Sequence, residues 1–166
     1  MCKKNNITFL LIKTIACVIV GAALNLIVHE ISHLISLLMF GGAAEEFSLG
    51  QLSFVAGYLD RRYIAPVALS SLIVPMCLSA ILLLIKNYYM SSINLGFTLP
   101  TIINGILGLF ATIFVKNQSR ETYDVALAFN NTSAKFLVIL FVITNIILCS
   151  LFMGLCFKQM SRSLDT

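Results

Sequence analysis

The run ITFLLIKTIACVIVGAALNLIVHEISHLISLLMF, from Ile7 to Phe40, decides the fold class. It is almost entirely apolar and about 34 residues long, more than the roughly 20 helical residues that cross a bilayer core. As one helix it would measure roughly 50 Å, so it must tilt, kink or project beyond the membrane. We interpret it as an uncleaved span, because its apolar part is too long for a signal peptide.

The composition of the whole chain indicates a membrane protein. Of the 166 residues, 59% are hydrophobic and 11% are charged, and the mean hydropathy is +0.97. Three further stretches are long enough to span a bilayer: 64–85, which Pro75 interrupts, 95–115 and 136–157. We therefore predict an all-α membrane protein, a single polytopic domain over residues 1–166 with about four transmembrane helices.

The charge pattern argues against nucleic acid as a partner. The net charge of +4 is small, and the basic residues lie in loops and near the ends of the chain. They divide almost evenly between the two expected sides of the membrane, so the positive-inside rule leaves the orientation open. The lipid bilayer itself is the partner that the composition implies.

The segments between the spans carry the remaining signals. Gly41 and Gly42 end the first helix, and residues 47–58 have the composition of strands, which favours a short β-hairpin-like segment at the membrane edge. The polar segment 116–135 follows two further crossings, so it returns to the side of the membrane that the end of the first span faces.

Five residues near the end of the first span, His29-Glu30-Ile31-Ser32-His33, predict a metal site. The two histidines are the only ones in the chain, and their i, i+4 spacing places both on one helix face. Ionisable groups inside a membrane span are costly and functional by default. The pattern is typical of a zinc site in which Glu30 serves as a base; the alternative is a buried polar network between helices.

A catalytic zinc usually has three protein ligands, so one more is needed. Without a third histidine, the acidic candidates are Glu45, Glu46, Asp60, Glu121, Asp124 and Asp165. The first two follow the helix too closely to fold back, Asp60 is expected to pair with the neighbouring arginines, and Asp165 is terminal. Glu121 and Asp124 remain, and spacing alone does not choose between them.

The same residues resemble a known family, the site-2 protease family of intramembrane zinc metalloproteases. The resemblance rests on HEISHL at 29–34, Phe40-Gly41-Gly42, Ser48-Leu49-Gly50 and Ala65-Pro66, over roughly residues 20–70. It is weaker over 100–130, where the family has an Asn-x-x-Pro segment followed by Asp-Gly. Here Asn117 and Asp124 match, whereas the proline is absent and Val125 replaces the glycine.

This resemblance implies a fold, an activity and a ligand set. Asp124 would be the third ligand, with His29 and His33, of one Zn²⁺ per chain, Glu30 the catalytic base, and Asn117 a substrate-binding residue. The substrates would be membrane proteins or peptides cut in or near transmembrane segments, with an accessory regulator allowed. The location would be a bacterial cell membrane.

Several interpretations stay open from the sequence. Asn25, one turn before His29, is a candidate substrate contact, although an ordinary hydrogen bond between helices is the favoured alternative. An edge strand within residues 47–58 would allow an extended substrate to add to the sheet. Two other functions also remain: an inactive relative that binds membrane segments, and a small transporter or immunity-type protein.

Overall fold

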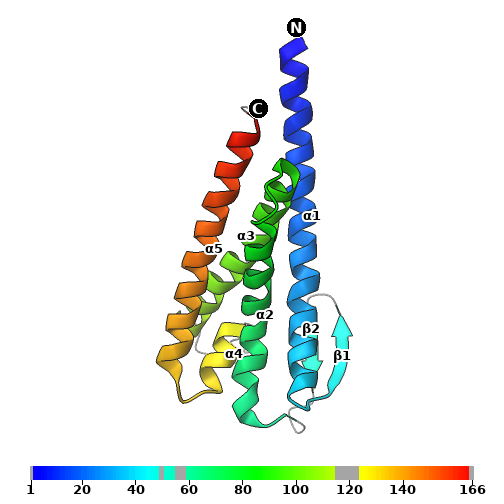
Figure 1. Ribbon diagram of the computed structural model, residues 1–166. Coiled ribbons are helices and arrows are strands. Elements are labelled where there is room, and N and C mark those ends of the chain that lie inside the picture. Colours follow the sequence, from blue (N-terminus) through cyan, green and yellow to red (C-terminus); the bar gives the residue numbers. More distant parts are fainter. Residues whose placement is uncertain (1, 49–50, 55–58, 115–123, 165–166) are drawn as a thin grey trace.

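The computed structural model describes residues 2–48, 51–54, 59–114 and 124–164. In chain order the elements are α1 (Cys2–Met39), β1 (Ala44–Ser48), β2 (Gln51–Phe54), α2 (Arg61–Leu82), α3 (Tyr88–Phe114), α4 (Asp124–Asn130) and α5 (Lys135–Leu164). Four long helices make up most of the molecule, and the sheet and α4 lie at the end away from both termini (Figure 1). Asn117 and Glu121 lie outside the described residues.

Four helices, α1, α2, α3 and α5, are long and apolar enough to cross a membrane. Large apolar side chains point outward along them; Ile19, Phe110 and Phe136 are each more than half exposed. In water such a surface would be unfavourable, whereas in lipid it meets a matching solvent. The predicted class, an all-α integral membrane protein with four spans, is confirmed.

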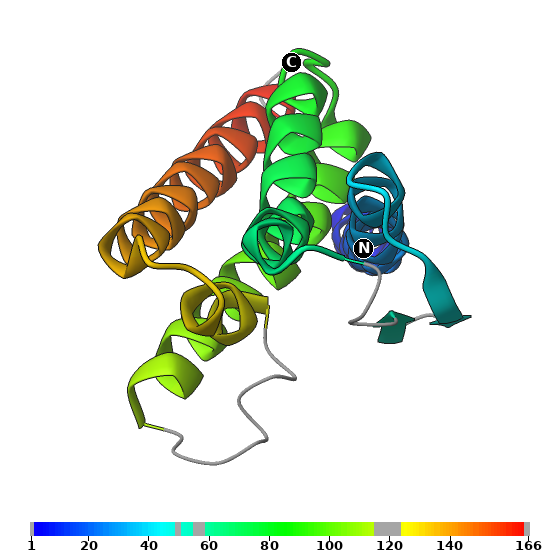
Figure 2. The same ribbon diagram turned by 90° about the horizontal axis from the view of Figure 1, so that it is seen from below.

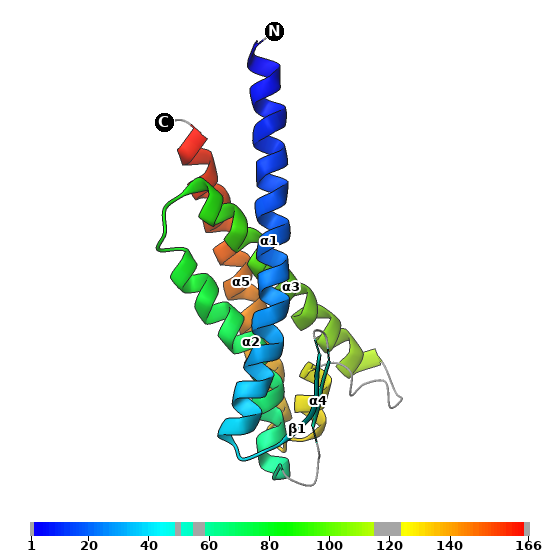
Figure 3. The same ribbon diagram turned by 90° about the vertical axis from the view of Figure 1, so that its right-hand side faces the viewer.

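Helix α1 extends well beyond the other helices at its N-terminal end (Figures 1 and 3), which is one of the outcomes expected for an overlong span. Its last residue is Met39, and Gly41 just beyond it has a φ of +78°, in the left-handed region. The amide of Gly42 donates to the Leu37 carbonyl at 2.9 Å, and that of Gly41 donates to Leu38 at 3.1 Å. This pair of bonds is the Schellman motif, which terminates helices at glycine.

The boundaries of the other spans differ from the predicted ones. Helix α2 ends at Leu82 and α3 begins at Tyr88, whereas the apolar runs suggested 85 and 95. Asn87 caps α3, since its side-chain oxygen accepts from the Tyr89 amide at 2.9 Å. Pro75 was expected to interrupt the second span, yet α2 runs through it as one helix. Neighbouring helices can satisfy the backbone groups that a proline frees.

Helices α1 and α3 cross at very short range because each contributes a glycine. A Cβ atom built on Gly21 would lie 1.9 Å from the Ile93 carbonyl oxygen, and one on Gly96 would lie 1.9 Å from that of Val18. Both obstacles are backbone atoms, which cannot turn aside as a side chain can. Small residues at a crossing let membrane helices pack backbone against backbone, where dispersion contacts are densest.

Buried polar side chains link the helices at several other points. The Asn25 amide donates to the Phe97 carbonyl at 2.7 Å and to the Thr101 hydroxyl at 2.9 Å. Ser79 on α2 bonds to Asn94 on α3 at 2.7 Å, and the Asn145 amide on α5 donates to the Leu72 carbonyl at 3.1 Å. Such bonds fix the rotation of helices whose apolar faces lipid would accept equally well.

The two short strands pair antiparallel and lie beside the C-terminal part of α1, outside the helix bundle (Figures 2 and 3). Helix α4 instead lies within the bundle's end, where Val125 and Ala128 are fully buried against α2 and α5. The polar segment predicted after the third span therefore contains a helix that is packed into the core. This packing positions the first residue of α4, Asp124.

The glycine crossing predicts a position-specific loss of stability. Replacing Gly96 by alanine should lower the free energy of unfolding by about 1–3 kcal/mol, because the added methyl group pushes the backbones of α1 and α3 apart. Thermal unfolding in detergent would measure the loss. Gly154→Ala is the matched control, because nothing lies within 4 Å of its added Cβ and alanine favours the helix by about 1 kcal/mol. Equal stability of the two variants would contradict the close backbone contact between α1 and α3 at Gly96.

Candidate metal centre

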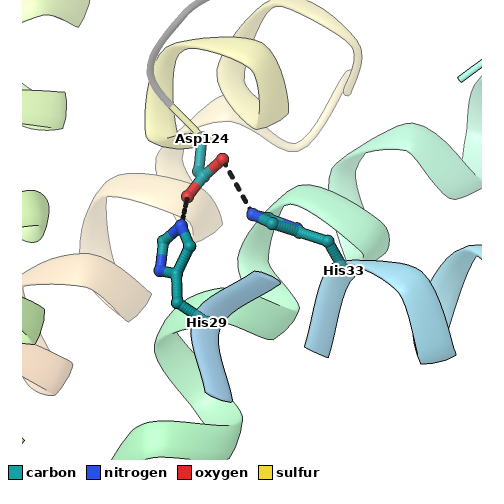
Figure 4. A group of neighbouring side chains, drawn as sticks. All are labelled: His29, His33 and Asp124. Carbon is teal, nitrogen blue, oxygen red and sulfur yellow. Dashed lines mark ion pairs between the residues drawn. The ribbon is translucent and has the colours of Figure 1, made fainter. Parts of the chain in front are cut away.

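Two elements far apart in the sequence bring the site together. His29 and His33 project from one face of α1, and Asp124, the first residue of α4, points toward both rings (Figure 4). Nε2 of His29 lies 3.2 Å from Oδ2 of Asp124, and Nε2 of His33 lies 3.1 Å from Oδ1. One ligand atom from each residue falls within 4.8 Å of the other two, so this group could hold a metal ion.

The imidazole of His33 is held in one orientation from its far side. Its Nδ1 lies 2.9 Å from the backbone carbonyl oxygen of Val67 on α2. A carbonyl can only accept, so Nδ1 carries a proton and, in the neutral ring, Nε2 presents its lone pair. That lone pair faces a carboxylate oxygen, and the contact is attractive only with a proton or a metal cation between the two atoms.

The carboxylate of Asp124 is oriented by two further helices. The Ser71 hydroxyl on α2 donates to Oδ2 at 2.7 Å, and the Asn104 amide on α3 donates to the same oxygen at 3.3 Å. Sequence reasoning missed both residues. In the sequence, these two residues stand out only as polar residues within apolar stretches. Many such residues bond only the backbone of their own helix, as Ser70 does with the Val67 carbonyl, so polarity alone does not identify a contact with a distant carboxylate.

The charge of Asp124 is stabilised despite its burial. Burial raises the pKa of a carboxyl group, but the hydrogen bonds of the His29 and His33 rings, and their positive charge when the rings are protonated, outweigh this and hold the pKa of Asp124 well below its usual range. The group is therefore a carboxylate at neutral pH. This is the form in which aspartate coordinates a metal.

The fourth member of the predicted site, Glu30, lies beside these groups. The residue is only 6% exposed, and it lies between the two histidines in the sequence of α1. In the part of the chain that the structure describes, its carboxyl group makes no hydrogen bond or ion pair. Buried carboxyl groups normally have a partner, so this one is suited to receive a proton or a polar molecule.

A glycine on α3 sets how closely helix α4 can approach α3. A Cβ on Gly108 of α3 would lie 2.6 Å from a methyl carbon of Val125, so the valine side chain occupies the space that this glycine leaves. Since Val125 follows Asp124 directly, this contact sets how closely the start of α4 approaches α3.

The other candidates of the sequence are placed differently. Asp60 pairs with Arg62 at 2.8 Å, as predicted, and does not reach the centre. The amide nitrogen of Asn25 is engaged with α3, which is the interhelical role that the sequence left as the alternative; a contact with substrate stays a prediction. Asn117 and Glu121 cannot be placed, because both fall in the range 115–123.

Comparisons with protein families, with curated proteins and with solved structures give no match to this chain.

The contact of Ser71 with Asp124 predicts an effect on metal affinity. Ser71→Ala should weaken zinc binding by about 10- to 100-fold, because groups that orient a ligand typically matter to that extent. Competition with a chromophoric chelator would measure it. Ser150→Ala is the matched control, since its hydroxyl donates to the Ile146 carbonyl of its own helix, α5. If the two variants bind zinc with equal affinity, Ser71 has no role in orienting the ligand Asp124.

Proposed function

We propose that this protein is an intramembrane zinc metallopeptidase, similar to the site-2 proteases, that hydrolyses peptide bonds in or near transmembrane segments. The observation that carries the proposal is the convergence of His29, His33 and Asp124 at the end of a membrane span, with Glu30 buried beside them. The setting would be the cell membrane of a bacterium.

The donor set suits zinc in kind and in spacing. Two imidazole nitrogens and one carboxylate oxygen are frequent ligands of catalytic zinc, which keeps a fourth position free. Two ligands at about 2.05 Å from a tetrahedral ion lie about 3.3 Å apart. The two nitrogen–oxygen separations, 3.2 and 3.1 Å, are close to this value, but each imidazole faces a different oxygen of Asp124. The three ligand atoms lie within 4.8 Å of one another, so the side chains would have to move for one ion to bind all three.

The chemistry divides between the ion and the side chains of this chain. When bound, zinc supplies Lewis acidity toward a peptide carbonyl and a water molecule. Glu30 takes up the proton of the attacking water and later delivers it to the leaving amine. Glu30 is buried and has no partner among the described residues, which supports this role, because no competing contact holds its carboxyl group away from the attacking water.

The centre is reachable from outside the bundle. The side chains of His29 and Asp124 keep 18% and 17% of their surface exposed, whereas residues that only connect helices, such as Asn94 and Asn145, are almost fully buried. A peptide must lose its helical hydrogen bonds to present a carbonyl there. The sheet order leaves one edge of each strand unpaired within the sheet, and such an edge can hold an extended segment.

Zinc content is the first test. Purified wild-type protein should hold about one zinc per chain, and Glu30→Gln should keep it. His33→Ala and Asp124→Asn should lose it, because three ligands are the usual minimum for a catalytic site. Asp60→Asn is the control for removing a carboxylate elsewhere, since Asp60 contacts only its own segment. A wild-type protein that takes up no zinc would overturn the proposal.

Peptide cleavage is the second test. Zinc-loaded protein would be reconstituted in liposomes with a panel of single-span model peptides, and products would be read by mass spectrometry. Glu30→Gln should cut at least 10²-fold more slowly than wild type while holding zinc, because general base catalysis contributes about 10²–10⁴-fold. Cleavage by this variant at the wild-type rate would exclude Glu30 as the base. Zinc binding without any cleavage would favour a role in binding membrane segments.

A further inference from the structure

A pocket of about 370 Å³ is lined by segments that lie at the end of the molecule opposite α4 (Figure 1). It opens between the link that joins α2 to α3 and the last turns of α5. Six residues line it: Lys86, Leu155, Lys158, Gln159, Arg162 and Ser163. Its volume falls in the range of small-molecule sites, and the mechanism proposed above makes no use of it.

The lining is strongly positive. Three of the six residues are cations, and none is acidic. In the described part of the chain, none of these three forms an ion pair. Lys158 and Arg162 stand one turn apart on α5, an arrangement in which like charges repel. An anion between them would relieve this repulsion, so the charge of the pocket selects a negatively charged ligand.

The pocket lies where a membrane boundary is expected. The spans of α2 and α5 end at Leu82 and Ser163, and α3 begins at Tyr88, so the lining residues surround the point where three helices leave the apolar region. Leu155 lines the pocket one to two turns before the cations, and the nearby Leu84 is 78% exposed. Positive charge above an apolar wall matches a ligand with an anionic head and an apolar tail.

The framework of the pocket is held in place before any ligand arrives. The Gln159 amide donates to the Leu83 carbonyl at 3.0 Å, and its side-chain oxygen accepts from the Ser91 hydroxyl at 2.8 Å. One side chain of α5 is thus bonded to the end of α2 and to the start of α3. This fixes the backbone that carries Lys86 relative to the backbone that carries Lys158 and Arg162.

We propose that this pocket binds the phosphate-bearing headgroup of an anionic phospholipid. Lys86, Lys158 and Arg162 contact the phosphate, and the acyl chains lie along Leu155 and the neighbouring apolar surface of α5. Basic pockets between membrane helices bind anionic headgroups by the same electrostatic attraction. The site is independent of the metal centre and of the activity proposed for it.

Lipid binding to the purified full-length protein tests the proposal. Native mass spectrometry in detergent would compare phosphatidylglycerol with phosphatidylcholine of identical acyl chains, and inorganic phosphate would be the competitor. Phosphatidylglycerol should bind at least tenfold more tightly, and millimolar phosphate should displace it only weakly, because phosphate lacks the apolar part. The double variant Lys158→Gln, Arg162→Gln should lose about thirtyfold in affinity, at roughly fivefold for each cation.

The control removes the same charge elsewhere. Lys13→Gln with Lys135→Gln takes away two cations that rest on aromatic rings outside the pocket, and it should leave lipid affinity within about twofold. Three outcomes would overturn the proposal. The first is equal binding of phosphatidylglycerol and phosphatidylcholine, and the second is an equal loss of phosphatidylglycerol affinity in the two double variants. The third is displacement of bound phosphatidylglycerol by phosphate as effectively as by free lipid, which would indicate a site for free anions. Unfolding temperatures of both variants would show that the chain still folds.

Discussion

The contact of the Asp124 carboxylate with the imidazoles of His29 and His33 determines how the helices are arranged at this end of the molecule. Asp124 lies at the start of a seven-residue helix, and its oxygens meet groups from α1, α2 and α3. A charge near the apolar region is costly unless donors or cations surround it. Three long helices therefore have to present their polar groups at one point, which fixes their rotation about their own axes.

Apolar packing alone would not fix that rotation. In lipid, an outward-facing leucine is as well solvated as an inward-facing one, so burial of apolar surface does little to choose between arrangements. The choice falls to the groups that lipid cannot satisfy: Asn25 between α1 and α3, Ser79 and Asn94 between α2 and α3, and Asn145 between α5 and α2. The glycine crossing adds a steric requirement to these bonds.

The fold could be predicted from the sequence to the extent that composition and spacing encode it. Four apolar stretches gave the spans, and the i, i+4 histidines gave a shared helix face. The ends of α2 and α3 were misplaced because Leu83–Ile85 and Tyr88–Asn94 do not change hydropathy where the hydrogen bonding changes. Only the resemblance chose Asp124 over Glu121. Ser71 and Asn104 were out of reach, because a serine or asparagine in an apolar helix has the same local appearance whether it bonds its own backbone or a distant carboxylate.

The fit of Val125 against Gly108 has a consequence for how this chain can vary. Val125 on α4 and Gly108 on α3 share one small volume, so a larger side chain at one position requires a smaller one at the other. In the resembling family a glycine follows the aspartate, whereas this chain has valine there and glycine at 108. Among homologous chains, positions 108 and 125 should therefore covary in size, with bulk on either helix α3 or helix α4 but not on both.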